Sequence, residues 1–203
     1  MGHDLINCCR IKHRIDFQQS LITTVHDYSL GNLDAVAFNR ELSQRPTTLL
    51  IPCLMEEFSR PALALIRDTL SSLKGLNRLV IALAAESEED VAHAEAFFAG
   101  MPFPVQVHWT NGPAVKDLLE SMGALGLEVT GPPGKGWAVW QGLGVACQDA
   151  EVVGLFDADI RTFGSAYPER MLRPLLDRSH GIAYVKAFYS RLSLETQALQ
   201  GRA

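Results

Sequence analysis

The sequence predicts an α/β fold in which helices cover both faces of a mostly parallel sheet. From Pro46 onward, short apolar runs alternate with segments of helical period, as in strands joined by right-handed helical crossovers. The run at residues 152–156 is apolar throughout, which is typical of a strand buried on both faces. The length of 203 residues suits one large domain that buries roughly 70% of the surface exposed by its unfolded chain.

The domain is expected to span residues 46–203, with residues 1–45 as an N-terminal extension. Charged residues between positions 12 and 16 interrupt the apolar pattern of this extension. A modest helical period over residues 33–42 predicts one helix near its end.

The first strand of the domain is predicted over residues 47–53. Pro61 then marks the start of a helix, because its fixed φ suits the first helical position. The apolar residues that follow at helical spacing are Leu63, Ile66, Leu70 and Leu73. Gly75 is expected to end this helix.

The second strand is predicted over residues 78–84, and Ser87 with the acidic residues after it is typical of a helix cap. A third strand is expected over residues 104–109. The turn Asn111-Gly112-Pro113 separates it from a helix over residues 115–122.

A loop rich in Gly and Pro, residues 123–136, leads to a helix over residues 137–147 and to the strand that ends at Asp157. Pro174 lies within the helical stretch 169–176, so that helix is expected to be kinked or to start late. A last strand is predicted over residues 181–189.

Composition excludes several classes of protein. A formal net charge of −5 and a pI near 5.7 argue against a sequence-independent nucleic-acid binder, which needs a basic face. No apolar run approaches the roughly 20 residues of a membrane-spanning helix. The N-terminus does not resemble a secretory signal, so we expect a cytoplasmic protein. The four cysteines lack C-x-x-C spacing, which argues against zinc and disulfide scaffolds.

Two carboxylates one residue apart, Asp157 and Asp159, follow the strand at residues 152–156. Ligands of α/β folds bind at this carboxyl edge of the sheet. Mg²⁺ and Mn²⁺ prefer oxygen ligands and use one or two protein carboxylates together with phosphate oxygens. The pair therefore predicts a metal-and-phosphate site, with two solvated turn acids as the alternative. An aspartyl-phosphate phosphatase is disfavoured because Arg161 stands where its motif has threonine.

The glycine-rich segment 131–136 immediately precedes a predicted helix. Its backbone N–H groups and the helix dipole could hold an anion, and Lys135 adds a positive charge. It is not a Walker A loop, because Gly136 stands where Ser or Thr would bind Mg²⁺. Nor is it a dinucleotide fingerprint, because Val139 replaces the third glycine. A plain connecting loop is the alternative.

Two further groups of side chains follow strands. Glu56 and Glu57 could accept hydrogen bonds from ribose hydroxyls or a pyrimidine N–H, although exposed glutamates are common in loops. Lys186, Tyr189 and Arg191 could bind an anionic acceptor, or they could be ordinary surface residues.

Four motifs in this order resemble the signature of GT-A glycosyltransferases, and most of all glucosyl-3-phosphoglycerate and mannosylglycerate synthases. They are IPCLMEE at 51–57, PGKG at 133–136, FDADI at 156–160 and VKAFYSR at 185–191. The resemblance implies a Rossmann-like GT-A fold that binds a nucleotide-diphosphate sugar, UDP-glucose or GDP-mannose. It also implies retaining, Mg²⁺- or Mn²⁺-dependent transfer of glucose or mannose to glycerate or 3-phosphoglycerate.

The resemblance also implies roles for individual residues. Around the donor nucleotide it places Pro52, Leu54, Glu56, Gly134, Lys135, Gly136 and Asp157. In catalysis it places Asp157, Asp159 and Lys135, with both aspartates at the metal. Near the acceptor it places Arg191, and Lys186 and Tyr189 stay acceptor candidates on the residue types alone.

Two departures from the family pattern matter. Met55 stands where many relatives carry Asn, at the base. Relatives also continue into an acceptor-binding segment and a histidine that completes the metal site, so this chain, ending at Ala203, is expected to be truncated to the donor half. The alternatives are a catalytically silent nucleotide-sugar-binding module and a structural partner domain. Uncovered apolar surface would favour homo-oligomers.

Overall fold

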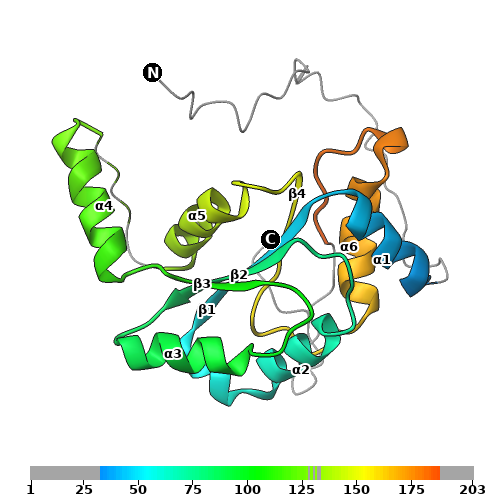
Figure 1. The fold of residues 1–203 in the computed structure, drawn as a ribbon, viewed down its shortest axis with the longest axis horizontal. Helices are drawn as coiled ribbons and strands as arrows, with labels where there is room; N and C mark the ends of the chain where they lie inside the picture. The colour runs from blue at the N-terminus through cyan, green and yellow to red at the C-terminus, as the bar shows by residue number, and fades with distance from the viewer. Residues whose placement is uncertain (1–32, 128, 130, 132–133, 188–203) are drawn as a thin grey trace, which may run out of the picture.

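A computed structural model describes residues 33–127, 129, 131 and 134–187 of the chain. Its centre is a four-stranded sheet with the strand order β3-β2-β1-β4 (Figure 1). All three strand pairs are parallel, which confirms the expected α/β fold. The strands are β1 (Thr47–Leu54), β2 (Arg78–Ala84), β3 (Val105–Trp109) and β4 (Val152–Leu155).

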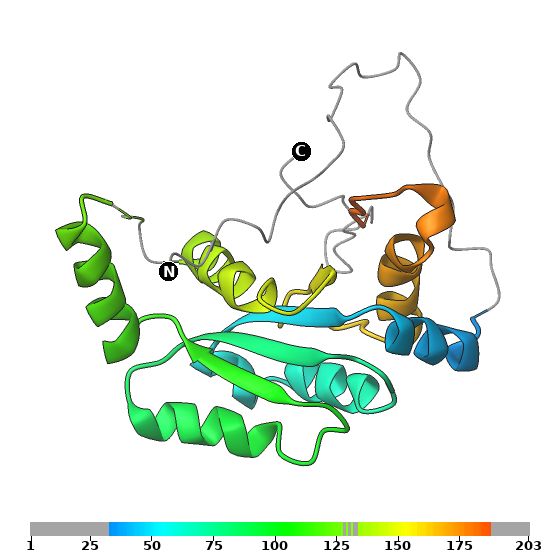
Figure 2. The same cartoon turned by 45° about the horizontal axis from the view of Figure 1, so that its top comes forward.

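Helices cover both faces of the sheet. Figure 2 shows α5 on one face and α2 and α3 on the other, while α1 and α6 pack together near β4. The helices are α1 (Ala35–Gln44), α2 (Pro61–Leu70), α3 (Glu88–Phe97), α4 (Pro113–Ala124), α5 (Lys135–Ala146) and α6 (Ala166–Leu176). Short 3-10 helices, η2 (Met55–Ser59) and η3 (Arg178–His180), follow β1 and α6.

The central strands are buried on both faces because alternate side chains enter two different cores. Leu49 and Ile51 of β1 belong to the larger core, with α1, α2, α3 and α6. Leu50 packs in a smaller core with Ala138 and Ala146 of α5. Because both faces of these strands are buried, their sequences are continuously apolar and do not alternate with polar residues.

Helix α5 approaches the sheet closely at Gly142. A Cβ atom built on Gly142 would lie 2.5 Å from Cδ1 of Leu50 and 3.2 Å from Cβ of Ala82. A residue without a side chain is therefore required where this helix crosses β1 and β2.

The predicted helix near residue 33 is confirmed as α1. Asp34 caps it, because its Oδ1 accepts a hydrogen bond from the N–H of Ala37 at 2.9 Å. Phe38 and Leu42 are buried in the larger core. This part of the expected extension thus packs against the domain.

The predicted helix starts at Pro61 and Ser87 are also confirmed. Pro61 occupies the first turn of α2. Ser87 and Asp90 form a capping box at the start of α3, in which each side chain accepts a hydrogen bond from the other residue's backbone N–H.

One sequence prediction was wrong, and one alternative of a second is excluded. Residues 181–187 form no strand, and residues 188 and 189 of that prediction lie outside the described residues. A strand requires a paired neighbour, and the local apolar pattern could not supply one; Tyr184 is 78% exposed. Helix α6 does not start late, since it begins at Ala166 and continues through Pro174 to Leu176, and the kink expected as the alternative stays a prediction. Pro174 has no backbone N–H to donate to the carbonyl oxygen of Arg170.

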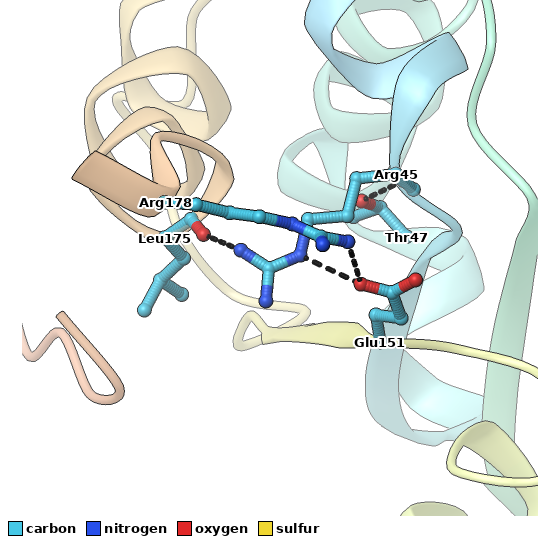
Figure 3. Close-up of polar contacts among 5 residues, drawn as sticks. All are labelled: Arg45, Thr47, Glu151, Leu175 and Arg178. Atoms are coloured by element: carbon cyan, nitrogen blue, oxygen red, sulfur yellow. Dashed lines mark hydrogen bonds and ion pairs between the residues drawn. The ribbon is translucent and has the colours of Figure 1, made fainter. Parts of the chain in front are cut away.

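A group of ionic contacts joins three chain segments at the amino edge of the sheet (Figure 3). Oε2 of Glu151, just before β4, lies 3.1 Å from Nε of Arg45 and 2.6 Å from Nη2 of Arg178. Arg45 also donates from Nη1 to the carbonyl oxygen of Leu175 in α6. The start of β1, the start of β4 and the end of α6 are tied together here.

Helix α4 is poorly covered, since none of its residues is buried. Leu118 in α4 and Leu125 just after it are 58% and 79% exposed. The expected self-association through uncovered apolar surface stays a prediction. Within the described residues, no helix has the length and apolar character needed to cross a membrane.

Candidate functional site

The carboxyl ends of all four strands surround a cavity of about 510 Å³. This is the edge at which parallel α/β sheets bind ligands. Segments far apart in the sequence line it, namely the ends of the strands and the first turn of α5: Pro52, Cys53, Leu54, Glu57, Ala84, Thr110, Asn111, Gly134, Lys135, Trp137, Ala138, Asp157, Ala158 and Asp159.

The structure brings Asp157, Asp159 and Lys135 together at this cavity. The ladder between β4 and β1 ends with the N–H of Phe156 donating to the carbonyl oxygen of Leu50 at 3.0 Å, so both aspartates follow the last paired position. Nζ of Lys135 lies 2.6 Å from Oδ1 of Asp157. The lysine and aspartate side chains are 60% and 34% exposed, which leaves both accessible to a ligand.

Gly134 shapes the start of α5. Its φ of 145° and ψ of −176° fall in a region that is essentially restricted to glycine. It is the N-cap of the 12-residue helix and provides no side-chain cap, so the first-turn N–H groups are available to an anion. Lys135 is the first residue of this helix and lines the cavity, whereas Gly136, also predicted at the nucleotide, is exposed and does not line it.

At the end of β1, the structure brings Glu57 rather than Glu56 to the cavity. Glu57 is 7% exposed, and its Oε1 binds Nη1 of Arg60 at 2.6 Å. Its buried Oε2 has no hydrogen-bond partner within the described part of the chain. The side chain of Glu56 is 59% exposed and pairs with Nη2 of Arg60 at 3.0 Å. The predicted neighbours Pro52 and Leu54 do line the cavity.

Glu57 is therefore a site residue, although the family resemblance placed only Glu56 at the donor nucleotide. The motif match favoured Glu56 because it counts positions along the sequence. In the structure, the turn of η2 directs the second glutamate inward. A buried carboxylate oxygen without a donor is costly, so a ligand donor at this position would be favourable.

Cys53 lines the same wall but is a poor nucleophile. It is 4% exposed, and burial together with the nearby charge of Glu57 raises the pKa of its thiol to about 12. The thiol therefore stays protonated at neutral pH, and we assign it a packing role.

The walls at the ends of β2 and β3 were not singled out from the sequence. Oγ1 of Thr110 donates to the carbonyl oxygen of Leu83 at 3.0 Å. Oδ1 of Asn111 accepts from the N–H of Ala85 at 3.1 Å, and its Nδ2 donates to the Ala85 carbonyl at 2.8 Å. These contacts fix one wall of the cavity. The signal was present in the Asn-Gly-Pro turn directly after a predicted strand.

Of the three predicted acceptor residues, the structure describes one, Lys186. Lys186 is exposed, in a segment without regular structure, and does not line the cavity. Tyr189 and Arg191 lie outside the described residues.

Within the described residues, the site offers a divalent cation two carboxylate ligands. Asp157 and Asp159 offer carboxylate oxygens to one cavity. No group of three or more His, Cys, Asp or Glu side chains able to hold a metal occurs among the residues that the structure describes. Mg²⁺ and Mn²⁺ fit such a donor set, because substrate phosphates and water complete their shells.

Two curated relatives match most of the chain, and both are glucosyl-3-phosphoglycerate synthases. The protein of Methanococcoides burtonii is 33% identical over 189 residues, 93% of this chain and 47% of the relative. The protein of Persephonella marina is 30% identical over 190 residues, 92% of this chain and 46% of the relative. The chain thus spans about half the length of the curated relatives it matches.

A solved structure supports the fold. The crystal structure of M. tuberculosis glucosyl-3-phosphoglycerate synthase matches with a TM-score of 0.52 and 22% identity, over 79% of this chain and 51% of that chain. No protein-family model matches. Over 93% of its length, the chain is a homologue of the glucosyl-3-phosphoglycerate synthases, and it has the GT-A glycosyltransferase fold.

Proposed function

We propose that this chain provides the nucleotide-sugar site of a glycosyltransferase that moves glucose from UDP-glucose to 3-phosphoglycerate. The observation that supports this most is the meeting of Asp157, Asp159 and Lys135 at one cavity of about 510 Å³. Names of the relatives support the choice of sugar and acceptor, since both are glucosyl-3-phosphoglycerate synthases. UDP-glucose is accordingly preferred to GDP-mannose as the donor.

The nucleoside end of the donor is expected to bind at the end of β1. Pro52 and Leu54 offer apolar surface, and Leu54 is 52% exposed in the free cavity. The unpaired Oε2 of Glu57 would accept a hydrogen bond from the uracil N–H or from a ribose hydroxyl. This assignment replaces Glu56 with Glu57 at the nucleoside.

The diphosphate is expected to bind at the start of α5. Nζ of Lys135 and the first N–H groups of this 12-residue helix supply positive potential there. Gly134 keeps the approach open, because among the described residues other than its chain neighbours no atom lies within 4 Å of a Cβ built on it. These groups stabilise the charge that grows on the leaving diphosphate.

Asp159 and Asp157 would hold Mg²⁺ or Mn²⁺ at the same diphosphate. When bound, the cation supplies Lewis-acid stabilisation of the leaving group. In the transfer, the bond between the anomeric carbon and the diphosphate oxygen breaks, and a bond to the acceptor hydroxyl oxygen forms. The proton of the acceptor hydroxyl passes to the oxygen of the leaving diphosphate, and the sugar keeps its anomeric configuration. Lys186, Tyr189 and Arg191 remain the proposed acceptor-binding residues.

A second candidate is a nucleotide-sugar-binding module without transferase activity. It is favoured by the position of Lys186, the proposed acceptor residue that the structure describes, because this residue does not line the cavity. Turnover of UDP-glucose with 3-phosphoglycerate and Mn²⁺ separates the two, because binding without transfer supports the module.

Calorimetric titration with UDP and Mn²⁺ tests the site itself. Wild-type protein is expected to bind UDP more tightly with Mn²⁺ than without, and Asp159→Ala is expected to lose this difference. Asp149→Ala, which removes an exposed carboxylate that pairs with Arg78, is the charge-matched control. Unchanged metal-dependent UDP affinity in Asp159→Ala would show that the metal assignment is wrong.

A further inference from the structure

Lys135 and Asp157 neutralise each other in the free site. Nζ of the lysine lies 2.6 Å from Oδ1 of the aspartate. Under the proposed function, on which this inference rests, each of these groups has a different ligand: the diphosphate for the lysine and the divalent cation for the aspartate. Neither ligand can make its full contact while the two side chains hold each other.

The ion pair is weak enough to exchange. Both partners are partly exposed, at 60% and 34%, and pairs of this kind typically change an equilibrium by only about two- to fivefold. The lysine ammonium ends a flexible four-carbon chain, so it can turn from a carboxylate to a nearby phosphate without movement of α5. Asp157, by contrast, immediately follows the position at which β4 is joined to β1.

We propose that Lys135 acts as a built-in counter-ion for Asp157 and couples the binding of nucleoside diphosphate to that of the divalent cation. Without nucleotide, Lys135 competes with cations for Asp157 and repels them. A bound diphosphate draws the ammonium away and frees the carboxylate. By linkage, the cation then strengthens nucleotide binding by the same factor as the nucleotide strengthens cation binding.

The competition is tested by measuring free Mn²⁺ by electron paramagnetic resonance in titrations of nucleotide-free protein with MnCl₂. Lys135→Met keeps the length of the side chain and removes its charge. It is expected to bind Mn²⁺ about two- to fivefold more tightly than wild type. Lys135→Arg, which keeps the charge, is expected to bind as weakly as wild type. Lys74→Met removes the same charge at an exposed position elsewhere and is expected to change nothing.

The coupling is tested by repeating the titrations with saturating UDP. The ratio of the Mn²⁺ dissociation constants without and with UDP is expected to be larger in wild type than in Lys135→Met. An equal ratio, or equal or weaker Mn²⁺ binding by nucleotide-free Lys135→Met, overturns the coupling role. Absence of Mn²⁺ binding in every variant overturns it as well. If wild-type protein does not bind UDP, the proposed function is overturned instead. The Mn²⁺ affinities of nucleotide-free wild type and Lys135→Met then still show whether Lys135 competes with the cation for Asp157.

Discussion

Substituting Gly142 by alanine tests the contact that places α5, and with it Lys135, over the sheet. The new Cβ would lie 2.5 Å from Cδ1 and 3.1 Å from Cδ2 of Leu50, and 3.2 Å from Cβ of Ala82. Carbon atoms in contact prefer about 3.5–4.0 Å. Leu50 is fully buried, so it has no free space into which to turn. Either the leucine leaves its rotamer or the helix lifts, at a cost of about 1–3 kcal/mol.

Gly144, in the same helix, provides the matched control. It is exposed, and apart from the backbone of its own helix and its chain neighbours, no atom in the described part of the chain lies within 4 Å of a Cβ built on it. Gly144→Ala therefore gains helix propensity, up to about 1 kcal/mol, without a clash. Gly142→Ala receives the same gain, so the difference between the two variants isolates the packing cost.

Urea unfolding of both variants and wild type measures this difference. We expect Gly142→Ala to be less stable than Gly144→Ala by about 1–3 kcal/mol, with similar m-values. If Gly142→Ala is as stable as Gly144→Ala, then α5 can shift without cost, and the close approach does not determine its position.

Two further predictions concern the wall formed by β1 and η2. Glu57→Gln is expected to weaken UDP binding by about tenfold or more, because a hydrogen bond to a charged acceptor is worth about 1.5–3 kcal/mol. The matched change at an exposed position, Glu56→Gln, is expected to change the affinity for UDP little. Isothermal titration calorimetry measures both affinities, and a larger loss in Glu56→Gln would restore Glu56 to the site. The pKa of the Cys53 thiol is raised from 9.0 to about 12, so the folded state holds this proton more tightly than the unfolded state. The resulting stability is complete below about pH 9 and is lost as the pH rises toward 12, by at most about 1.4 kcal/mol per pH unit. Urea unfolding between about pH 8 and 10 should thus show a steeper decline for wild type than for Cys53→Ala, and parallel declines contradict the burial of a protonated thiol.

The central strands β1 and β2 were predictable because their burial is almost continuous. Leu49 and Leu50 enter opposite cores, so β1 needs apolar residues at successive positions and contrasts with its polar flanks. Local chemistry also marked the helix starts at Pro61 and Ser87, since a fixed φ and a capping box act within one turn. The aspartates after β4 could be placed at the carboxyl edge of the sheet because they directly follow a predicted strand.

The missed features depend on contacts between distant segments. Residues 181–187 have an apolar pattern, but pairing with a neighbour decides whether a strand forms. Glu56 and Glu57 are chemically identical neighbours, and only the turn of η2 determines which one reaches the cavity. Asn111 becomes a wall of the site through bonds to Ala85, 26 positions away.

The ionic contacts of Glu151 with Arg45 and Arg178 have a consequence for how the scaffold can diverge. They fasten the sheet at the edge opposite the cavity, and none of their members lines it. Loops that contact ligand can therefore exchange residues while this anchorage persists. The same scaffold can thereby acquire new ligand specificities, because the ligand-binding residues and the stabilising ion pairs lie at opposite ends of the same strands.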